Sequence, residues 1–162
     1  MNAKLWLVLL LSLTAAPANA LQIGVVAPDF TLKSAAGVNL RLHEFRGDVI
    51  LLNFWGSWCG PCAQELPALQ DLHERYHAQG LQVLGVNLDN DEAAARNAIR
   101  RLDIEFPTLF DTRKTASGLY QPDDLPQTYI IDRDGMVQFE YKGYKPGQEK
   151  KYDEIIKQLL NQ

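Results

Sequence analysis

The chain has 162 residues, a formal net charge of −4 and 46% hydrophobic residues, which suits one domain with an adequate core. A mildly acidic chain without basic clusters has no electrostatic footprint for nucleic acid and no attraction to anionic lipid. No internal repeat, low-complexity tract or Pro/Gly/Ser-rich linker divides it.

Residues 1–20 have the pattern of a secretory signal peptide. One positive charge at Lys4 precedes a nine-residue apolar run, Leu5 to Leu13, and small residues end the segment at Ala20. The alternative is a retained membrane anchor, but this run is shorter than the roughly 20 residues that span a bilayer. We therefore expect a cleaved signal peptide and, at residues 21–162, one soluble domain in the periplasm.

The first expected elements of this domain are a hairpin, a strand and a helix. Residues 29–42 predict a hairpin that turns near Gly37, and the apolar run 49–54 predicts a buried strand. A helix follows and stops near Gly80. Its apolar face is marked by residues three and four apart: Leu66, Leu69, Leu72 and Tyr76.

Strands and helices continue to alternate in the second half of the chain. We expect strands at 81–88, 107–110, 128–132 and 136–141, and helices at 91–102 and 148–160. The last helix should bury one face, formed by Tyr152, Ile155, Ile156 and Leu159. The prediction is an α/β sandwich with a central mixed β-sheet flanked by helices and an N-terminal β-hairpin.

Cys59 and Cys62 are the only cysteines, and Gly60 and Pro61 separate them. A structural disulfide is a poor explanation, because so small a ring restricts the unfolded chain very little. A structural zinc site needs four ligands, and the sequence has no second pair at matching spacing. Redox chemistry is favoured, because a C-x-x-C between a strand and a helix reads as a thioredoxin-like motif.

The position of the two cysteines predicts different roles for them. Both lie where the expected strand gives way to a helix, and the unpaired N–H groups of a helix start stabilise a thiolate. Cys59, at the very start, should be the exposed nucleophile. Cys62, one turn into the helix, should be the shielded resolving thiol.

Two short motifs suggest metal sites, and both are disfavoured. His73, Glu74 and His77 match the H-E-x-x-H pattern of metalloproteases. The longer form of that pattern needs a third histidine where Val83 stands, so two solvated histidines on a helix are the better interpretation. Residues 89–92 begin like a calcium loop but lack its glycine and final glutamate. We expect no metal and no dissociable cofactor.

Taken together, these motifs resemble the thioredoxin superfamily, and within it the TlpA/ResA-like branch of exported thiol:disulfide oxidoreductases. The matching segments occur in that family's order from about Val26 to the C-terminus. They are APDFTL, LLNFWGSWCGPC, the following ELP, LPQTYIID and a later DG. The WCGPC motif is the most specific of them.

The resemblance implies a substrate-binding surface around the cysteines. Pro126 would be the cis proline opposite the pair, and Leu125 would offer a backbone edge to a substrate strand. Gly60 and Pro61 would belong to the same surface. Trp58, directly before the nucleophile, would add a flat apolar area on which a partner protein docks.

Glu65 is the candidate proton-transfer residue. Ordinary thioredoxins carry a buried aspartate six residues before the first cysteine, where this chain has Asn53, which cannot take a proton from Cys62. Glu65 lies three residues after Cys62, on nearly the same helix face, and the resembling branch has this arrangement. The alternative is that Glu65 only complements the helix N-terminus.

The resulting hypothesis is a monomeric protein-disulfide reductase that cycles between a Cys59-Cys62 dithiol and disulfide. The resemblance implies a membrane thiol-disulfide transporter as electron donor, and exported proteins with cysteine pairs, such as apocytochrome c, as substrates. One alternative is an oxidase that donates disulfides to folding exported proteins. A non-catalytic docking module and a thiol peroxidase are less favoured.

Overall fold

The computed structural model describes residues 23–162, so the expected signal segment at 1–20 lies outside the described residues. Within this range, no helix combines the length and the apolar character needed to cross a membrane. The strands are β1 (Thr31–Ser34), β2 (Asn39–Arg41), β3 (Val49–Trp55), β4 (Leu81–Asn87), β5 (Thr108–Phe110), β6 (Gln127–Ile131) and β7 (Val137–Lys142). The helices are α1 (Gly60–Tyr76), α2 (Glu92–Arg101), α3 (Thr115–Tyr120) and α4 (Glu149–Leu160), with short 3-10 turns η1 (Leu42–Phe45) and η2 (His77–Gln79).

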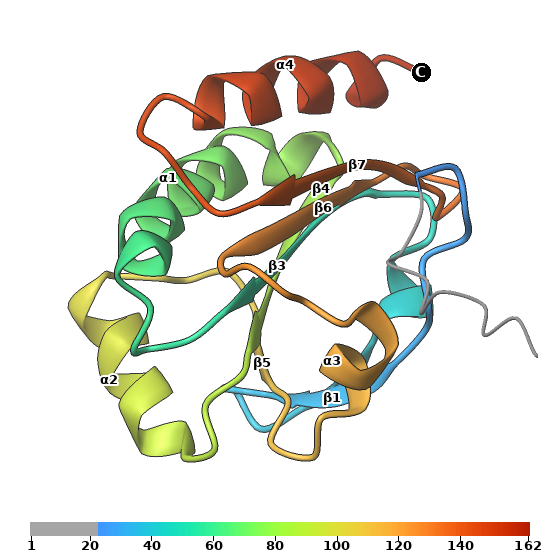
Figure 1. The fold of residues 1–162 in the computed structure, drawn as a ribbon. Coiled ribbons are helices and arrows are strands. Elements are labelled where there is room, and N and C mark those ends of the chain that lie inside the picture. Colours follow the sequence, from blue (N-terminus) through green and yellow to red (C-terminus); the bar gives the residue numbers. More distant parts are fainter. Residues whose placement is uncertain (1–22) are drawn as a thin grey trace, which may run out of the picture.

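All seven strands form one mixed sheet in the order β2-β1-β5-β4-β3-β6-β7 (Figure 1). The β3-β4 and β4-β5 pairs are parallel, and the other pairs are antiparallel. The expected mixed α/β architecture is therefore confirmed. The expected hairpin is β1-β2, and its connection contains Gly37 at φ 85°, a conformation that favours glycine.

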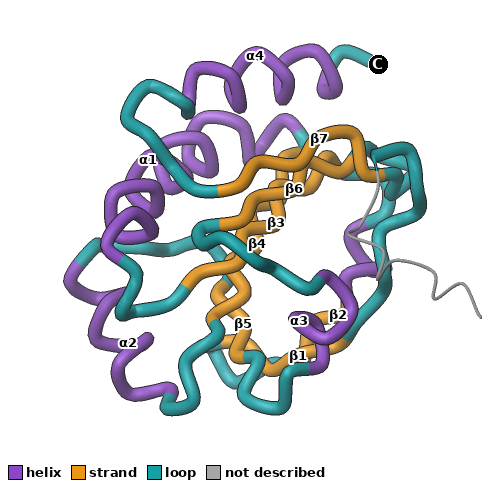
Figure 2. The backbone as a smooth tube through the Cα atoms, viewed as in Figure 1, coloured by secondary structure: helices purple, strands orange, loops and turns teal. Residues whose placement is uncertain are grey.

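The sheet is covered on both faces, which is why β3 is buried along its whole length. Alternate residues of β3 enter two separate clusters: Val49 and Leu51 face one way, Ile50 and Leu52 the other. The first cluster packs against α1, α2 and α4, and the second against α3 and the segment that contains β1. Figure 2 shows α1 and α4 together on one side of the sheet and α3 on the other.

The helices expected at 91–102 and 148–160 match α2 and α4 to within one residue. The helix expected to stop near Gly80 ends earlier, at Tyr76, and the 3-10 turn η2 continues the chain to Gln79. Helix α3 was not expected. Its six residues include a serine and a glycine and show no apolar period. The side chain of Asp111, four residues before the helix, accepts hydrogen bonds from the N–H groups of Thr115, Ala116 and Ser117. This cap compensates for a first turn that has no capping side chain of its own.

The strand register brings the candidate site residues together at one end of the central strands. Asn53 of β3 lies opposite Thr128 of the antiparallel β6, so both side chains point to the face covered by α1 and α4. The parallel strands β3 and β4 end together, with Trp55 opposite Asn87. The segments that follow these two strands, and the segment that precedes β6, therefore meet at this end.

Replacing Ile156 by alanine tests the packing of α4 on this face. Ile156 is fully buried, whereas its neighbour Ile155 is only partly buried. We expect Ile156→Ala to lower the free energy of unfolding by about 2 to 5 kcal/mol. Ile155→Ala should have less than roughly half this effect. Urea unfolding measures both, and equal losses would contradict the orientation of α4.

Candidate active site

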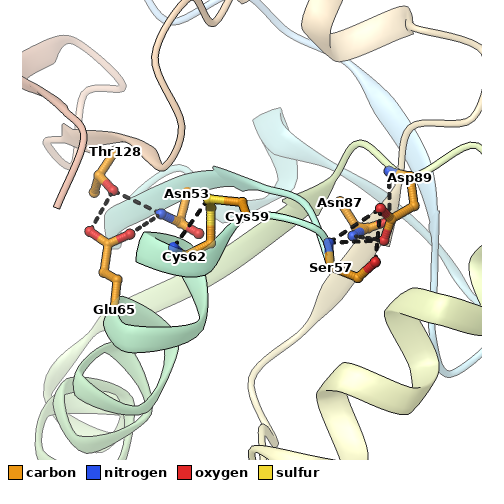
Figure 3. Close-up of a disulfide and its surroundings, with 8 residues drawn as sticks. All are labelled: Asn53, Ser57, Cys59, Cys62, Glu65, Asn87, Asp89 and Thr128. Carbon is orange, nitrogen blue, oxygen red and sulfur yellow. Dashed lines mark hydrogen bonds between the residues drawn. A yellow bond between two sulfur atoms is a disulfide. The ribbon is translucent and has the colours of Figure 1, made fainter.

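Cys59 and Cys62 form a disulfide at the start of α1 (Figure 3). Cys59 is the N-cap residue, with extended backbone at φ −91° and ψ 108°, and its Sγ lies 3.1 Å from the Cys62 N–H, which donates to it. Pro61 falls in the first turn, where a missing N–H leaves no helical hydrogen bond unmade. This arrangement directs helix N–H dipoles at Cys59, which would stabilise a thiolate there.

The two cysteines differ in exposure in the predicted order, but Cys59 is less exposed than expected. The Cys59 residue is 7% exposed and Cys62 is 0% exposed. Both belong to the core cluster on which α1 packs, and Leu125 packs against that cluster. Closing the disulfide holds Cys59 against this apolar surface, so only one side of it faces solvent.

An open cleft of about 720 Å³ reaches Cys59. Its walls come from the start of α1, from the segment after β4 and from α3 with the segment that follows it. The lining residues are Trp58, Cys59, Gly60, Pro61, Leu88, Lys114, Ser117, Gln121, Pro122, Asp123, Asp124 and Leu125. Four of the predicted substrate-binding residues therefore share one cleft with Cys59.

The remaining predicted substrate-binding residue, Pro126, does not line this cleft. It is buried and follows the lining residue Leu125 through a cis peptide bond. Trp58, which also lines the cleft, is 69% exposed, an unusual position for a large aromatic side chain. The cleft thus combines an exposed aromatic side chain next to Cys59 with the backbone segment that leads into the cis proline.

Glu65 is fully buried one turn after Cys62, and three donors hold its carboxyl group. Asn53 Nδ2 donates to Oε2 at 2.7 Å. Thr128 Oγ1 and Tyr152 Oη donate to Oε1 at 3.1 and 2.8 Å. These partners come from β3, β6 and α4, so the carboxyl group joins the sheet to two helices.

The environment of Glu65 suits proton exchange. Burial raises the pKa of its carboxyl group to about 7, although the hydrogen bonds from Tyr152, Thr128 and Asn53 favour the ionised form and oppose the rise. The group therefore changes its protonation state near neutral pH. A carboxyl group with such a pKa can accept a proton and release it again under physiological conditions.

Asp89 is a site residue that the sequence analysis missed. It is largely buried and accepts hydrogen bonds from Ser57 N at 3.2 Å, from Ser57 Oγ at 3.1 Å and from Asn87 Nδ2 at 2.9 Å (Figure 3). The Leu88 N–H also donates to the Trp55 carbonyl at 2.9 Å. These contacts fix the segment that leads into Cys59. The signal was an acidic residue two positions after a buried strand, at the strand end where α/β proteins place their sites.

Neither suggested metal motif forms a metal site in the described structure. Across residues 23–162, no three His, Cys, Asp or Glu side chains group closely enough to hold an ion. The His73 and His77 rings lie against each other, with centroids 4.7 Å apart. Burial and the neighbouring His77 lower the pKa of His73, so the protonated form of His73 is disfavoured.

Comparisons with known proteins agree with this geometry. The sequence model of the AhpC/TSA family matches residues 23–140. A relative from Bacillus cereus named thiol-disulfide oxidoreductase ResA is 34% identical over 117 residues, 72% of this chain and 68% of the relative. The Bacillus subtilis protein of the same name is 32% identical over 114 residues, 70% of this chain and 64% of the relative.

A solved structure shares both the fold and part of the sequence. It is a crystal structure from Chlorobium tepidum, described as a thiol:disulfide interchange protein DsbE. The TM-score is 0.82 at 34% identity, and the match covers 86% of this chain and 99% of the other. The expected thioredoxin-like fold and the assignment to the ResA-like branch are therefore confirmed.

The raised pKa of Glu65 predicts how stability depends on pH. Between its ordinary pKa of 4.5 and its folded pKa of about 7, the folded protein holds a proton that the unfolded chain has released. Stability from this group is therefore present below 4.5 and lost as the pH rises to about 7. The loss should be on the order of 3 kcal/mol.

The Glu65→Gln variant should lack this pH-dependent contribution to stability, because its amide does not titrate. We expect the difference in unfolding free energy between wild type and Glu65→Gln to change with pH across this window, as measured by urea unfolding of the oxidised proteins. A constant difference would show that the Glu65 carboxyl group has an ordinary pKa in the folded state.

Asp89→Ala tests whether the loop contacts position the cleft. Losing the acceptor of Ser57 should loosen Trp58 and Cys59, and we expect the KM for a disulfide peptide to rise by about tenfold. Asp91→Ala is the matched control, because Asp91 caps α2 through the Ala93 N–H and does not contact Ser57. The control should lose stability and keep its KM. An equal change in KM in both variants would contradict the role of Asp89.

Proposed function

The chain belongs to the AhpC/TSA family and is a thiol-disulfide oxidoreductase, and from this premise we propose that it is an exported reductase of disulfides in partner proteins. The observation that carries the proposal is the cysteine pair at the start of α1. Cys59 opens to a cleft, Cys62 is closed to solvent, and a buried carboxyl group with a pKa of about 7 lies one turn further on.

The first step is attack by the Cys59 thiolate on a disulfide of the partner. A bond forms between Cys59 Sγ and one partner sulfur, and the other partner sulfur leaves as a thiolate. The Cys62 N–H and the start of α1 stabilise the attacking thiolate. The cleft accommodates the partner chain beside Trp58 and Leu125.

The second step releases the partner. Cys62 gives its proton to Glu65 and attacks Cys59 Sγ, which forms the Cys59-Cys62 disulfide and expels the second partner thiolate. Two electrons have then passed from the protein dithiol to the partner disulfide. A dithiol donor must restore them, and the resemblance to the ResA-like branch suggests a membrane thiol-disulfide transporter for this role.

One feature supports the reducing direction. Gly60 and Pro61 between the cysteines are the pair found in strongly reducing thioredoxin. The buried Glu65 carboxyl group serves either direction, because it can take a proton from Cys62 during reduction of a partner and return it during oxidation. The alternative, an oxidase of folding exported proteins, would use the same residues with the opposite resting state.

The substrates we propose are exported proteins with oxidised cysteine pairs, for example apocytochrome c. The segment before β6 supports binding of an extended chain. No backbone hydrogen bond within the described part of the protein uses the N–H or C=O of Leu125. A substrate strand could pair there, in register with Cys59. Export and the periplasmic location follow from the signal-like pattern of residues 1–20.

Trapping experiments in cells test this function. Cys62→Ser keeps the nucleophile and lacks the resolving thiol, so it should accumulate mixed disulfides with exported proteins, visible on non-reducing gels. Cys59→Ser, the matched control, should accumulate none. Equal trapping by the two variants would reverse or remove the assigned roles.

The direction of electron flow is tested on freshly isolated wild-type protein. Rapid alkylation of free thiols should find Cys59 and Cys62 mostly as thiols if a donor keeps the protein reduced. A predominantly disulfide form in cells with an intact donor would favour the oxidase instead.

A further inference from the structure

Among the described residues, Tyr152 is the only residue of α4 that forms a hydrogen bond with Glu65. Its side chain is fully buried, and its hydroxyl lies 2.8 Å from Glu65 Oε1, across 87 residues of sequence. Packing alone explains an aromatic ring at this position of an amphipathic helix. Packing does not explain the hydroxyl, because phenylalanine would fill the same space without a polar atom to satisfy.

A neighbouring hydrogen-bond donor leaves the Tyr152 hydroxyl to act as a donor to Glu65. Gln148 Nε2, one turn earlier on the chain, donates to the Tyr152 oxygen at 2.7 Å. Because that oxygen already accepts a hydrogen bond, its own hydrogen is free to point at the carboxyl group. The Tyr141 ring packs edge-on against the Tyr152 ring at a centroid distance of 5.0 Å and holds it in place.

The ionised form of Glu65 depends on such donors. The elements packed around it contribute Asn53 from β3, Thr128 from β6 and Tyr152 from α4, and the titratable groups that interact with it are Tyr152 and Tyr144. No Lys, Arg or His side chain of residues 23–162 is among the groups that shift the pKa of Glu65. A buried carboxylate without a cation is stabilised only by hydrogen bonds, so each donor has a large effect.

We propose that Tyr152 is a positioning residue of the redox reaction. Its hydroxyl holds the Glu65 carboxylate in place and favours its ionised form, so that Glu65 can take the proton of Cys62 at neutral pH. This inference rests on the proposed role of Glu65 as proton acceptor. It makes the last helix of the chain part of the active site, although α4 contributes no residue to the cleft that opens at Cys59.

The proposal predicts the direction in which the pKa of Glu65 shifts when the Tyr152 hydroxyl is removed. Removing a donor from a carboxylate disfavours the charged form, so the pKa of Glu65 should rise above its value of about 7. A rise of about one unit would lower the ionised fraction at pH 7 by roughly fivefold. Resolution of the mixed disulfide should slow by the same factor at pH 7 and recover as the pH rises past the new pKa.

Tyr152→Phe is the test, because it removes the hydroxyl and keeps the ring. Glu65 is titrated directly by carbon-13 NMR of the side-chain carboxyl group in the full domain. The rate of mixed-disulfide resolution is measured in parallel by stopped flow, with a model disulfide peptide, over the same pH range. We expect the NMR midpoint and the rate profile to move upward together.

Tyr76→Phe is the matched control. The Tyr76 hydroxyl donates to Asp153 at 2.6 Å, so it also joins α1 to α4, but it does not contact Glu65. This variant should lose stability without moving either midpoint. A Tyr152→Phe profile that is lowered equally at every pH, or an unchanged Glu65 midpoint, would reduce Tyr152 to a packing residue and overturn the proposal.

A shifted NMR midpoint with an unshifted rate profile would also overturn it, and would remove Glu65 from the proton transfer. Because the peptide assay needs no physiological partner, these outcomes do not depend on the proposed substrate or the direction of electron flow. Those points are decided by the trapping and alkylation experiments alone.

Discussion

A carboxyl group buried without a cation is the constraint around which this fold is arranged. Removing Glu65 from water is costly, and hydrogen bonds must compensate for the loss. This need accounts for the polar side chain of Asn53 in the otherwise apolar strand β3 and for that of Thr128 opposite it in β6. It also requires their register and the close approach of α1 and α4, because the donors reach Glu65 only when all four elements are in place.

Two carboxylates on either side of the disulfide have different tasks because their environments differ. Figure 3 shows Glu65 on one side of the Cys59-Cys62 pair and Asp89 on the other. Asp89 lies just after β4, where the backbone N–H and the hydroxyl of Ser57 donate to it and hold it against the segment between β3 and α1. Glu65 lies within the core, where burial brings its pKa close to neutral. One carboxylate fixes geometry and the other is suited to exchange a proton.

Local patterns were sufficient to predict most of the fold and the reactive pair. The apolar run of β3, the spacing along α1 and the position of the cysteines between them are properties of short segments, so the sequence alone reveals them. The roles of Asp89 and Tyr152 depend on partners 32 and 87 residues away. Tyr152 was correctly placed on a buried helix face, but no local pattern indicates what its hydroxyl contacts. Helix α3 was missed for a similar reason, because the side chain that caps it lies outside the helix.

The two ends of the described chain lie away from the end of the sheet that carries the cysteine pair. At one end, the Gly24 N–H donates to the Val137 carbonyl at 2.7 Å, and at the other, Arg133 Nη2 donates to the Leu160 carbonyl at 3.2 Å. Val137 and Arg133 belong to the far end of the β6-β7 hairpin, opposite the end where Pro126 enters β6 (Figure 1). A tether joined at either end would therefore leave the mouth of the cleft unobstructed.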